Sequence, residues 1–291
     1  MKSNKFVIVV LLPVFILAAV FLVAPLFYGL GISLFDYNAL RLKNPFVGLE
    51  NYRNLVSDPI FLKALKNTLV FVGVAVSINI TVTLCLSSIL VDLPWKKWRN
   101  FFRTIFFIPC IAPLVTSAVI WNKGMMMTQG GILNTMLSHF GIGPVNWLGD
   151  PKMVMISVIL FTIWADFGYN TVLFCAGLEA IPQDFLEAAE IDGAGPWRRF
   201  ISIRLPLLGR TFLFVVTTTL ISHFQMIVQF MVLVFKGGVN NSATTLAYYV
   251  YQKGFTEKKM GYASAVATVL FVIIFAVSMI QRRLNKVDWE Y

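Results

Sequence analysis

Long apolar blocks alternate with shorter polar segments along the 291-residue chain. A helix needs about 20 apolar residues to cross the hydrocarbon core of a bilayer. Six blocks reach that length, so we expect an all-α membrane protein with six transmembrane helices in a single domain over residues 1–291. The predicted spans lie near residues 6–34, 65–91, 104–122, 153–178, 208–235 and 261–281.

The first block resembles a secretion signal in one respect, because Lys2 and Lys5 precede it. The apolar region of a cleaved signal has about 7–15 residues, and this block is much longer. We therefore interpret it as a retained helix. Pro109 and Pro113 interrupt the third block, and membrane helices tolerate proline where neighbouring groups satisfy the freed carbonyls.

Composition agrees with a chain that is solvated by lipid. Hydrophobic residues make up 58% of the sequence and charged residues 13%, whereas soluble domains carry about a quarter charged residues. The formal net charge is +10, but the basic residues lie beside the apolar blocks. That position is typical of membrane-flanking charge and argues against nucleic acid as a partner.

Lysine and arginine near the span ends predict the orientation, because positive charge concentrates on the cytoplasmic side. Six spans place both termini on one side, and the shorter, more densely basic segments belong to that side. We therefore expect both termini in the cytoplasm. The basic residues of this set are Lys2, Lys5, Lys96, Lys97, Arg99, Arg103, Arg198, Arg199, Arg204, Arg210, Arg282, Arg283 and Lys286.

Two segments predicted on the outer side, residues 35–64 and 124–152, are too long to be simple turns. The second predicts a short helix from Ile132 to Phe140, between Gly130-Gly131 and Gly141. Such segments suit either a docking surface for an external partner or interfacial helices that lie on the bilayer. The sequence leaves both interpretations open.

One inner segment, residues 179–206, has the pattern of a short helix, a turn and a second helix. Pro182 suits the first turn, where its missing N–H is harmless, and Asp184 favours the positive end of the helix dipole. Gly193 after Asp192 suits the helix end, because glycine adopts positive φ at little cost.

The first of these two helices has one face with small side chains. The paired alanines make that face thin, which allows close approach by another surface. The second helix is amphipathic and leads into the next span, so the segment is suited to transmitting force as a rigid body. The residues expected on the thin face, at positions i, i+3, i+4 and i+7, are Phe185, Ala188, Ala189 and Asp192.

The same segment resembles a known motif. Glu187-Ala188-Ala189 and Asp192-Gly193-Ala194, followed by Phe200, Ile203, Leu205 and Pro206, look like the "EAA" loop of ABC importer permeases. The resemblance implies the type I ABC importer transmembrane fold, in which the short helix sits in a cleft of the ATP-hydrolysing subunit. It assigns coupling to that subunit to Glu187, Ala188, Ala189, Asp192, Gly193 and Ala194.

Other segments are similar to the sugar and glycerol-phosphate branch of this family, the MalF/UgpA type. They are residues 35–38, 46–52, 103–109, 146–150 and 261–265. The resemblance implies a permease subunit of an ATP-driven, binding-protein-dependent importer in the bacterial plasma (inner) membrane. Its cargo would be an oligosaccharide, a monosaccharide or a glycerol-phosphate-like solute. Permeases for non-sugar solutes share the scaffold.

The resemblance also implies partners. They are a second, homologous permease subunit, two nucleotide-binding ATPase subunits and an extracytoplasmic solute-binding protein. This chain contains no Gly-x-x-x-x-Gly-Lys-[Ser/Thr] phosphate loop, so it is predicted not to be an enzyme and to bind no cofactor. ATP and Mg would be held by the partner ATPase subunits.

Polar residues inside the predicted spans are candidates for a solute pathway, because a carboxylate at mid-bilayer favours an inward position. Aromatic rings with amides or carboxylates are suited to gripping sugars. The alternative is that such residues join helices, and the partner subunit could hold the solute contacts instead. The candidates are Trp164, Asp166, Tyr169 and Asn170, with Ser222, Gln225 and Gln229 expected on one face of the fifth span.

Two other functional classes fit less well. A secondary transporter commonly shows two similar halves and several intramembrane charges, and neither is evident. A membrane enzyme needs a nucleophile–base or metal constellation, and none is found.

The three cysteines, Cys85, Cys110 and Cys175, lack metal-ligand spacing, so no metal site is predicted. In this family, relatives often carry an acidic residue after the Phe-Gln pair of the fifth span, whereas here Phe224-Gln225 is followed by the uncharged Met226, Ile227, Val228 and Gln229.

Overall fold

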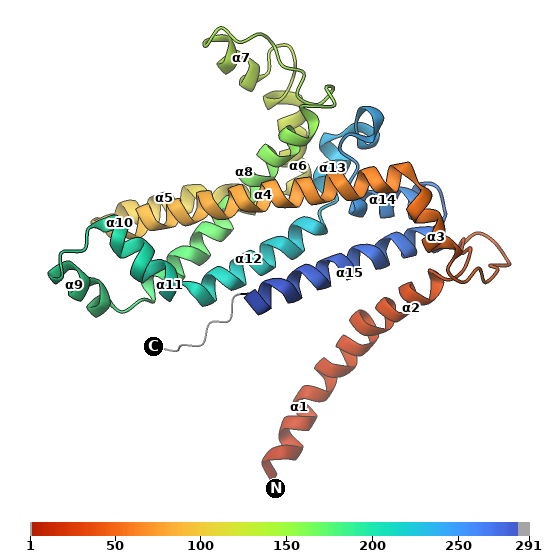
Figure 1. The fold of residues 1–291 in the computed structure, drawn as a ribbon, viewed down its shortest axis with the longest axis horizontal. Helices are drawn as coiled ribbons and strands as arrows, with labels where there is room; N and C mark the ends of the chain where they lie inside the picture. The colour runs from red at the N-terminus through yellow and green to blue at the C-terminus, as the bar shows by residue number, and fades with distance from the viewer. Residues whose placement is uncertain (1, 285–291) are drawn as a thin grey trace. The chain divides into compact units, whose positions relative to one another are not determined.

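The computed structural model describes residues 2–284, and in this part of the chain every regular element is a helix (Figure 1). Lys286, which belongs to the orientation argument, lies outside the described residues. The chain forms two compact units. Unit 1 comprises the chain up to Leu62 together with Leu246–Val272, and unit 2 comprises Lys63–Thr245 together with the residues from Ile273 onward.

The membrane-protein prediction is confirmed at the level of helix length and composition. Among the described residues, four helices are long and apolar enough to cross a bilayer, and two bent pairs raise the number to six if each pair is one span. The four are Ile8–Ile32, Pro59–Val91, Val154–Glu179 and Met260–Arg283; the pairs are Lys96–Ile111 with Leu114–Met125, and Pro196–Leu207 with Gly209–Phe224.

The third predicted span, 104–122, differs from the structure. Helix α5 begins earlier and covers Lys96–Ile111, and α6 (Leu114–Ile120) follows at 92° and continues as a π-helical turn, η2 (Trp121–Met125). The break is at Pro113, which has no N–H and forces the preceding Ala112 into extended backbone with ψ 138°. The bend therefore has a local cause in the sequence.

The fifth predicted span, 208–235, is also interrupted. Helix α12 covers Gly209–Phe224, and the short α13 covers Val228–Leu233. The N–H of Gln225 and the N–H of Met226 bond to carbonyls three residues back, which closes the helix with a tight final turn. Ser222, Gln225 and Gln229 therefore do not share one helical face, and that prediction was wrong.

Unit 2 is built around α8 (Val154–Glu179), which packs against α5 and α12 (Figure 1). Gly168 permits the contact with α5, because a Cβ atom there would overlap the carbonyl oxygen of Phe106. Unit 2 also contains most of α4 (Pro59–Val91), the later part of α15 (Met260–Leu284) and several short elements. These are α7 (Ile132–Ser138), α9 (Gln183–Ile191), α10 (Pro196–Arg199), η3 (Phe200–Arg204), α11 (Leu205–Leu207), η4 (Phe235–Gly237) and η5 (Val239–Asn241).

We expect Gly168→Ala to destabilise the protein, because the new methyl group forces α5 and α8 apart. Overpacking of this kind costs about 1–3 kcal/mol. Gly73→Ala in α4 is the matched control, since no atom lies within 4 Å of its added Cβ. Thermal denaturation of the detergent-purified protein should show a lower midpoint for Gly168→Ala alone. Equal midpoints for the two variants would contradict the close α5–α8 contact.

The helix expected between Gly130-Gly131 and Gly141 is confirmed, although it ends at Ser138. Asn134 fixes the surrounding segment. Its amide nitrogen donates to the carbonyls of Met127, Thr128 and Val145, and its oxygen accepts from the indole of Trp147.

Unit 1 contains α1 (Lys2–Ala18), a π-helical turn η1 (Ala19–Val23), α2 (Ala24–Ile32), α3 (Glu50–Ser57), α14 (Leu246–Tyr251), η6 (Gln252–Thr256) and the first part of α15 (Met260–Leu284). Asp58 ties these elements together, because it accepts hydrogen bonds from the hydroxyls of Tyr249 and Tyr262. Burial raises the pKa of the Asp58 carboxyl, but these two bonds and two backbone N–H bonds outweigh burial and lower it below the usual value.

Candidate functional site

The segment between α8 and α12 folds as the sequence predicts. Helix α9 begins directly after Pro182, one position later than expected, and Asp192 ends it. Gly193 has φ +77°, and its N–H bonds to the carbonyl of Glu190. The N–H of Ala194 bonds to the carbonyl of Ala189. We call residues 179–206 the docking segment.

The two sides of α9 differ sharply in exposure. Leu186 and Ala189 point inward, each with 8% of its surface exposed. Ala188 lies outside, and so does Ile191, which is 86% exposed. The expected thin face therefore needs one correction: Ala189 does not share the outer surface with Phe185, Ala188 and Asp192, because it packs inward one turn after Leu186. Glu187 is also exposed.

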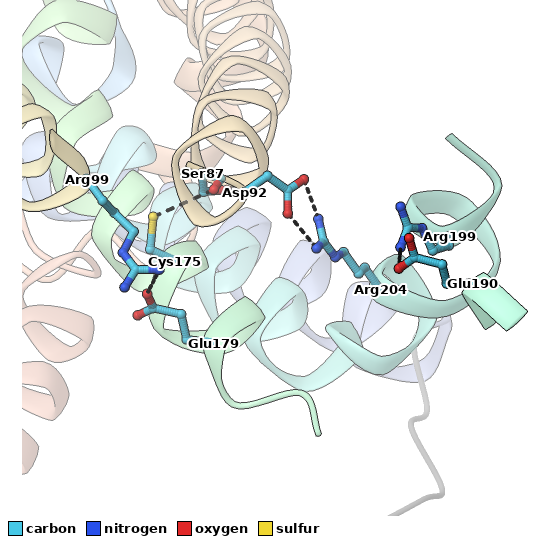
Figure 2. A network of polar contacts seen from close by, with 8 residues as sticks. All are labelled: Ser87, Asp92, Arg99, Cys175, Glu179, Glu190, Arg199 and Arg204. Carbon is cyan, nitrogen blue, oxygen red and sulfur yellow. Dashed lines mark hydrogen bonds and ion pairs between the residues drawn. The ribbon is translucent and has the colours of Figure 1, made fainter. Parts of the chain in front are cut away.

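Ion pairs attach the docking segment to neighbouring helices (Figure 2). Arg204 donates through both terminal nitrogens to both oxygens of Asp92, at 2.8 and 2.6 Å. Glu179, the last residue of α8, accepts from Arg103 of α5 at 2.8 Å and lies 3.5 Å from Arg99. These pairs join the two ends of the segment to α4 and α5.

A further pair closes the segment on itself: Arg199 of α10 bonds to Glu190 of α9 at 2.7 Å (Figure 2). Behind α9 lies a cavity of about 500 Å³. Its lining combines both signs of charge, and consists of Asp92, Gln183, Leu186, Glu187, Glu190, Pro196, Arg199 and Arg204.

A second cavity, of about 480 Å³, lies among α5, α6, α8 and α12. We call it the interhelical cavity. Asp166 is the one acidic side chain in its lining, and Asn170, Tyr169 and several hydroxyls supply further polar atoms. The lining comprises Phe107, Pro109, Cys110, Ala112, Leu114, Ala165, Asp166, Tyr169, Asn170, Thr218, Thr219, Ser222, His223 and Met226.

A polar cluster supports one wall of the interhelical cavity. The amide nitrogen of Asn170 donates to Asn79 of α4 at 2.7 Å and to Thr219 of α12 at 3.0 Å. His223 is 2% exposed, and its Nε2 lies 4.0 Å from the nearer carboxylate oxygen of Asp166. That Nε2 has no hydrogen-bond partner among the described residues. Asp166 and His223 therefore offer an acceptor and a ring nitrogen to a polar molecule in the cavity.

The structure separates the predicted pathway residues into two groups. Asp166, Tyr169, Asn170 and Ser222 line the interhelical cavity. Trp164 lies outside its lining and packs against Trp121, with ring centroids 5.2 Å apart. Gln225 lies in the exposed break after α12, and Gln229 is buried in α13; neither lines the cavity.

Sequence reasoning did not select three residues of this region: Asn79, Thr219 and Cys110. Asn79 interrupts the apolar run of α4, and an isolated amide in such a run is a usable signal. Thr219 and Cys110 carry no comparable signal, because threonine and cysteine are common in apolar helices. Their positions become informative only when the bend at Pro113 is known.

The chain was compared with known proteins. Residues 85–286 match the family model described as "Binding-protein-dependent transport system inner membrane component". The chain is 34% identical over 270 residues to the lactose transport system permease protein LacF of Rhizobium radiobacter, covering 92% of this chain and 89% of that protein. It is 31% identical over 291 residues to the probable ABC transporter permease protein YurN of Bacillus subtilis, covering 99% of each.

One solved structure shares the fold along the whole chain. It is a chain of a bacterial alginate ABC transporter in complex with an alginate pentasaccharide-bound periplasmic protein. The TM-score is 0.86 at 21% identity, with 100% of this chain and 98% of that chain covered.

Proposed function

This chain belongs to the family of binding-protein-dependent transport system inner membrane components, and on that premise we propose that it forms part of the translocation pathway for an uncharged carbohydrate. It is a permease of an ABC importer, a non-catalytic multi-pass subunit of the inner membrane. Residues 1–291 would form one type I transmembrane domain, with residues 179–206 as its coupling loop.

The observation that carries the coupling role is the exposure pattern of α9. A nine-residue helix with Leu186 and Ala189 turned inward leaves Phe185, Ala188 and Ile191 facing out. Exposed apolar side chains in such an arrangement are typical of a protein–protein contact. We propose that the nucleotide-binding ATPase subunit covers this face, with Glu187 and Asp192 at its rim.

The orientation follows from this assignment. ATP-hydrolysing subunits work in the cytoplasm, so the docking segment would face the cytoplasm together with both termini. Arg99, Arg103, Arg198, Arg199 and Arg204 would then lie on the cytoplasmic side, where basic residues concentrate. The segment around α7 would face outward and receive a solute-binding protein, a kind of partner that the alginate transporter also has.

The interhelical cavity supports a neutral, hydroxyl-rich solute. Asp166 accepts hydrogen bonds, and its negative charge repels phosphate or uronate groups. A hydroxyl can donate to Asp166 and accept from a protonated Nε2 of His223, while the Tyr169 ring provides an apolar surface for sugar C–H groups. Among the relatives, the lactose transport permease LacF fits this class, whereas the sn-glycerol-3-phosphate transport permease UgpA is named for a charged solute.

The complex would contain a second, homologous permease subunit and two ATPase subunits. ATP and Mg would bind to those ATPase subunits. Alternating access would then arise because closure of the ATPase dimer displaces the docking segment. Expression of this chain alone is expected to give neither transport nor ATPase activity.

Cross-linking tests the coupling proposal. We expect Ala188→Cys, on the exposed side of α9, to cross-link to the ATPase subunit in the assembled complex. Ala189→Cys is the matched control, because Ala189 is adjacent in sequence but is 8% exposed and faces inward. Both variants should be made with Cys85 replaced by serine, since Cys85 is exposed. The proposal fails if Ala188→Cys gives no adduct with the ATPase subunit, or if Ala189→Cys reacts equally well.

A further inference from the structure

The Asp92–Arg204 ion pair connects parts of the chain that are 112 residues apart in sequence. Asp92 follows the last residue of α4, the longest helix among the described residues. Arg204 is the last residue of the π-helical η3, just before the 71° bend that leads into α12. The pair therefore joins the end of α4 to the point where the docking segment meets its own membrane helix (Figure 2).

The geometry of this pair fixes orientation as well as distance. Two parallel N–H···O bonds hold the guanidinium and the carboxylate in one plane. The Arg204 side chain is 16% exposed and the Asp92 side chain is 53% exposed, so water screens only part of the attraction between them. Because the two bonds run in parallel, the pair holds the docking segment in one orientation against the end of α4.

The docking segment is stiffened between α9 and this pair. Arg199 bonds to Glu190 across the turn, so α9 and α10 are tied together. Continuous helical structure from Pro196 to Leu207 then carries any displacement of α10 to Arg204. At the other end of the segment, Glu179 is held by Arg103.

We propose that Asp92 and Arg204 are positioning residues that pass movement of the docking segment to α4. This inference rests on the proposed function, because it takes α9 as the surface that the ATPase subunit moves. It adds a specific path: movement of α9 passes through the Glu190–Arg199 pair to α10, and then through the Arg204–Asp92 pair to the end of α4. Through Asn79 of α4, which bonds to Asn170, the path reaches the polar cluster of the interhelical cavity.

The test uses the full complex and needs no knowledge of the solute. Cys110 lines the interhelical cavity and serves as the reporter, while Cys175 is buried and Cys85 is replaced by serine. The rate at which a water-soluble methanethiosulfonate modifies Cys110 is measured with and without Mg-ATP plus vanadate. In the otherwise unaltered complex we expect nucleotide to change this rate by at least about fivefold, the lower end of coupling between distant sites.

Asp92→Asn and Arg204→Gln are expected to remove this nucleotide response while the complex still hydrolyses ATP. Arg204→Lys should remove most of it as well, because lysine keeps the charge but cannot form the bidentate pair. The exchanged pair, Asp92→Arg with Arg204→Asp, should restore the response. Lys97→Gln is the matched control, since Lys97 is exposed and, among the described residues, Arg99 and Arg103 rather than Lys97 pair with Glu179.

Three results would overturn the inference: a normal nucleotide response in Asp92→Asn and Arg204→Gln, no recovery in the exchanged pair, or loss of the ATPase subunit from the single variants. The last would make the pair a structural brace. Failure of the proposed function is distinguishable, because then the Ala188→Cys adduct is absent from the unaltered docking segment.

Discussion

Gly193→Pro is expected to reduce uptake by about tenfold or more while the chain still inserts into the membrane, because the turn after α9 can no longer form. Gly193 has φ +77°, and proline is locked near −65°. Proline also lacks the N–H that bonds to the carbonyl of Glu190. Helix α9 would lose its C-terminal turn and with it the fixed placement of its outer face.

Two variants separate this effect from a general disturbance of the segment. Gly195→Ala should leave uptake near the normal level, because Gly195 has φ −65° and no atom within 4 Å of an added Cβ. Gly193→Asn should retain much of the uptake, since asparagine tolerates the left-handed region. Uptake and ATP hydrolysis are measured together in proteoliposomes.

The ratio of the two rates gives the coupling. The expected pattern for Gly193→Pro is continued ATP hydrolysis with little uptake. A Gly193→Pro complex that transports normally would rule out a mechanical role for the turn. Equal losses in Gly193→Pro and Gly195→Ala would show that the segment tolerates no change and that the positive φ is not the cause.

Sequence patterns predicted some elements closely for identifiable reasons. The fourth block, 153–178, corresponds to α8 at Val154–Glu179, because a long apolar run without proline forms one continuous helix in a bilayer and so satisfies its backbone hydrogen bonds. The turn at Gly193 was predictable because an Asp-Gly pair after an amphipathic run is a strong helix-end signal. In both cases the information is local to the element.

The breaks in the third and fifth predicted spans, and the choice of which face of α9 is buried, depend on tertiary structure. Pro113 was visible, but membrane helices often continue through proline, so the 92° bend could not be inferred from it. The end of α12 at Phe224 has no proline or glycine to announce it. Similarly, Ala189 faces inward because α9 packs on that side, and a short helix with alanines on several faces does not encode which one is covered.

The candidate pathway residues divided for the same reason. A prediction from periodicity placed Ser222, Gln225 and Gln229 together, and the helix end at Phe224 separated them. Asp166, Tyr169 and Asn170 stayed together because they lie on one uninterrupted helix. Residues on one continuous helix can be assigned to a shared face from the sequence, whereas residues on either side of a helix break can be grouped only from the three-dimensional structure.

Asp166→Asn is expected to raise the KM for uptake by about tenfold, with little change in the amount of assembled complex. A hydrogen bond to a charged group is worth about 1.5–3 kcal/mol, and about 1.4 kcal/mol corresponds to a factor of ten. The substitution keeps the size of the side chain but replaces the carboxylate that faces the interhelical cavity. The measurement is the rate of uptake at increasing carbohydrate concentration. The carbohydrate is first identified as a ligand of the partner solute-binding protein.

Asp166→Glu is the matched comparison, because it keeps the carboxylate within a cavity of about 480 Å³. It should restore most of the affinity if the charge contacts the solute. A packing role predicts the opposite ranking: the isosteric Asn would be tolerated, and the longer Glu would impair assembly. An assembly defect in Asp166→Asn with an unchanged KM would therefore assign Asp166 to helix packing, and would place the solute contacts on the second permease subunit.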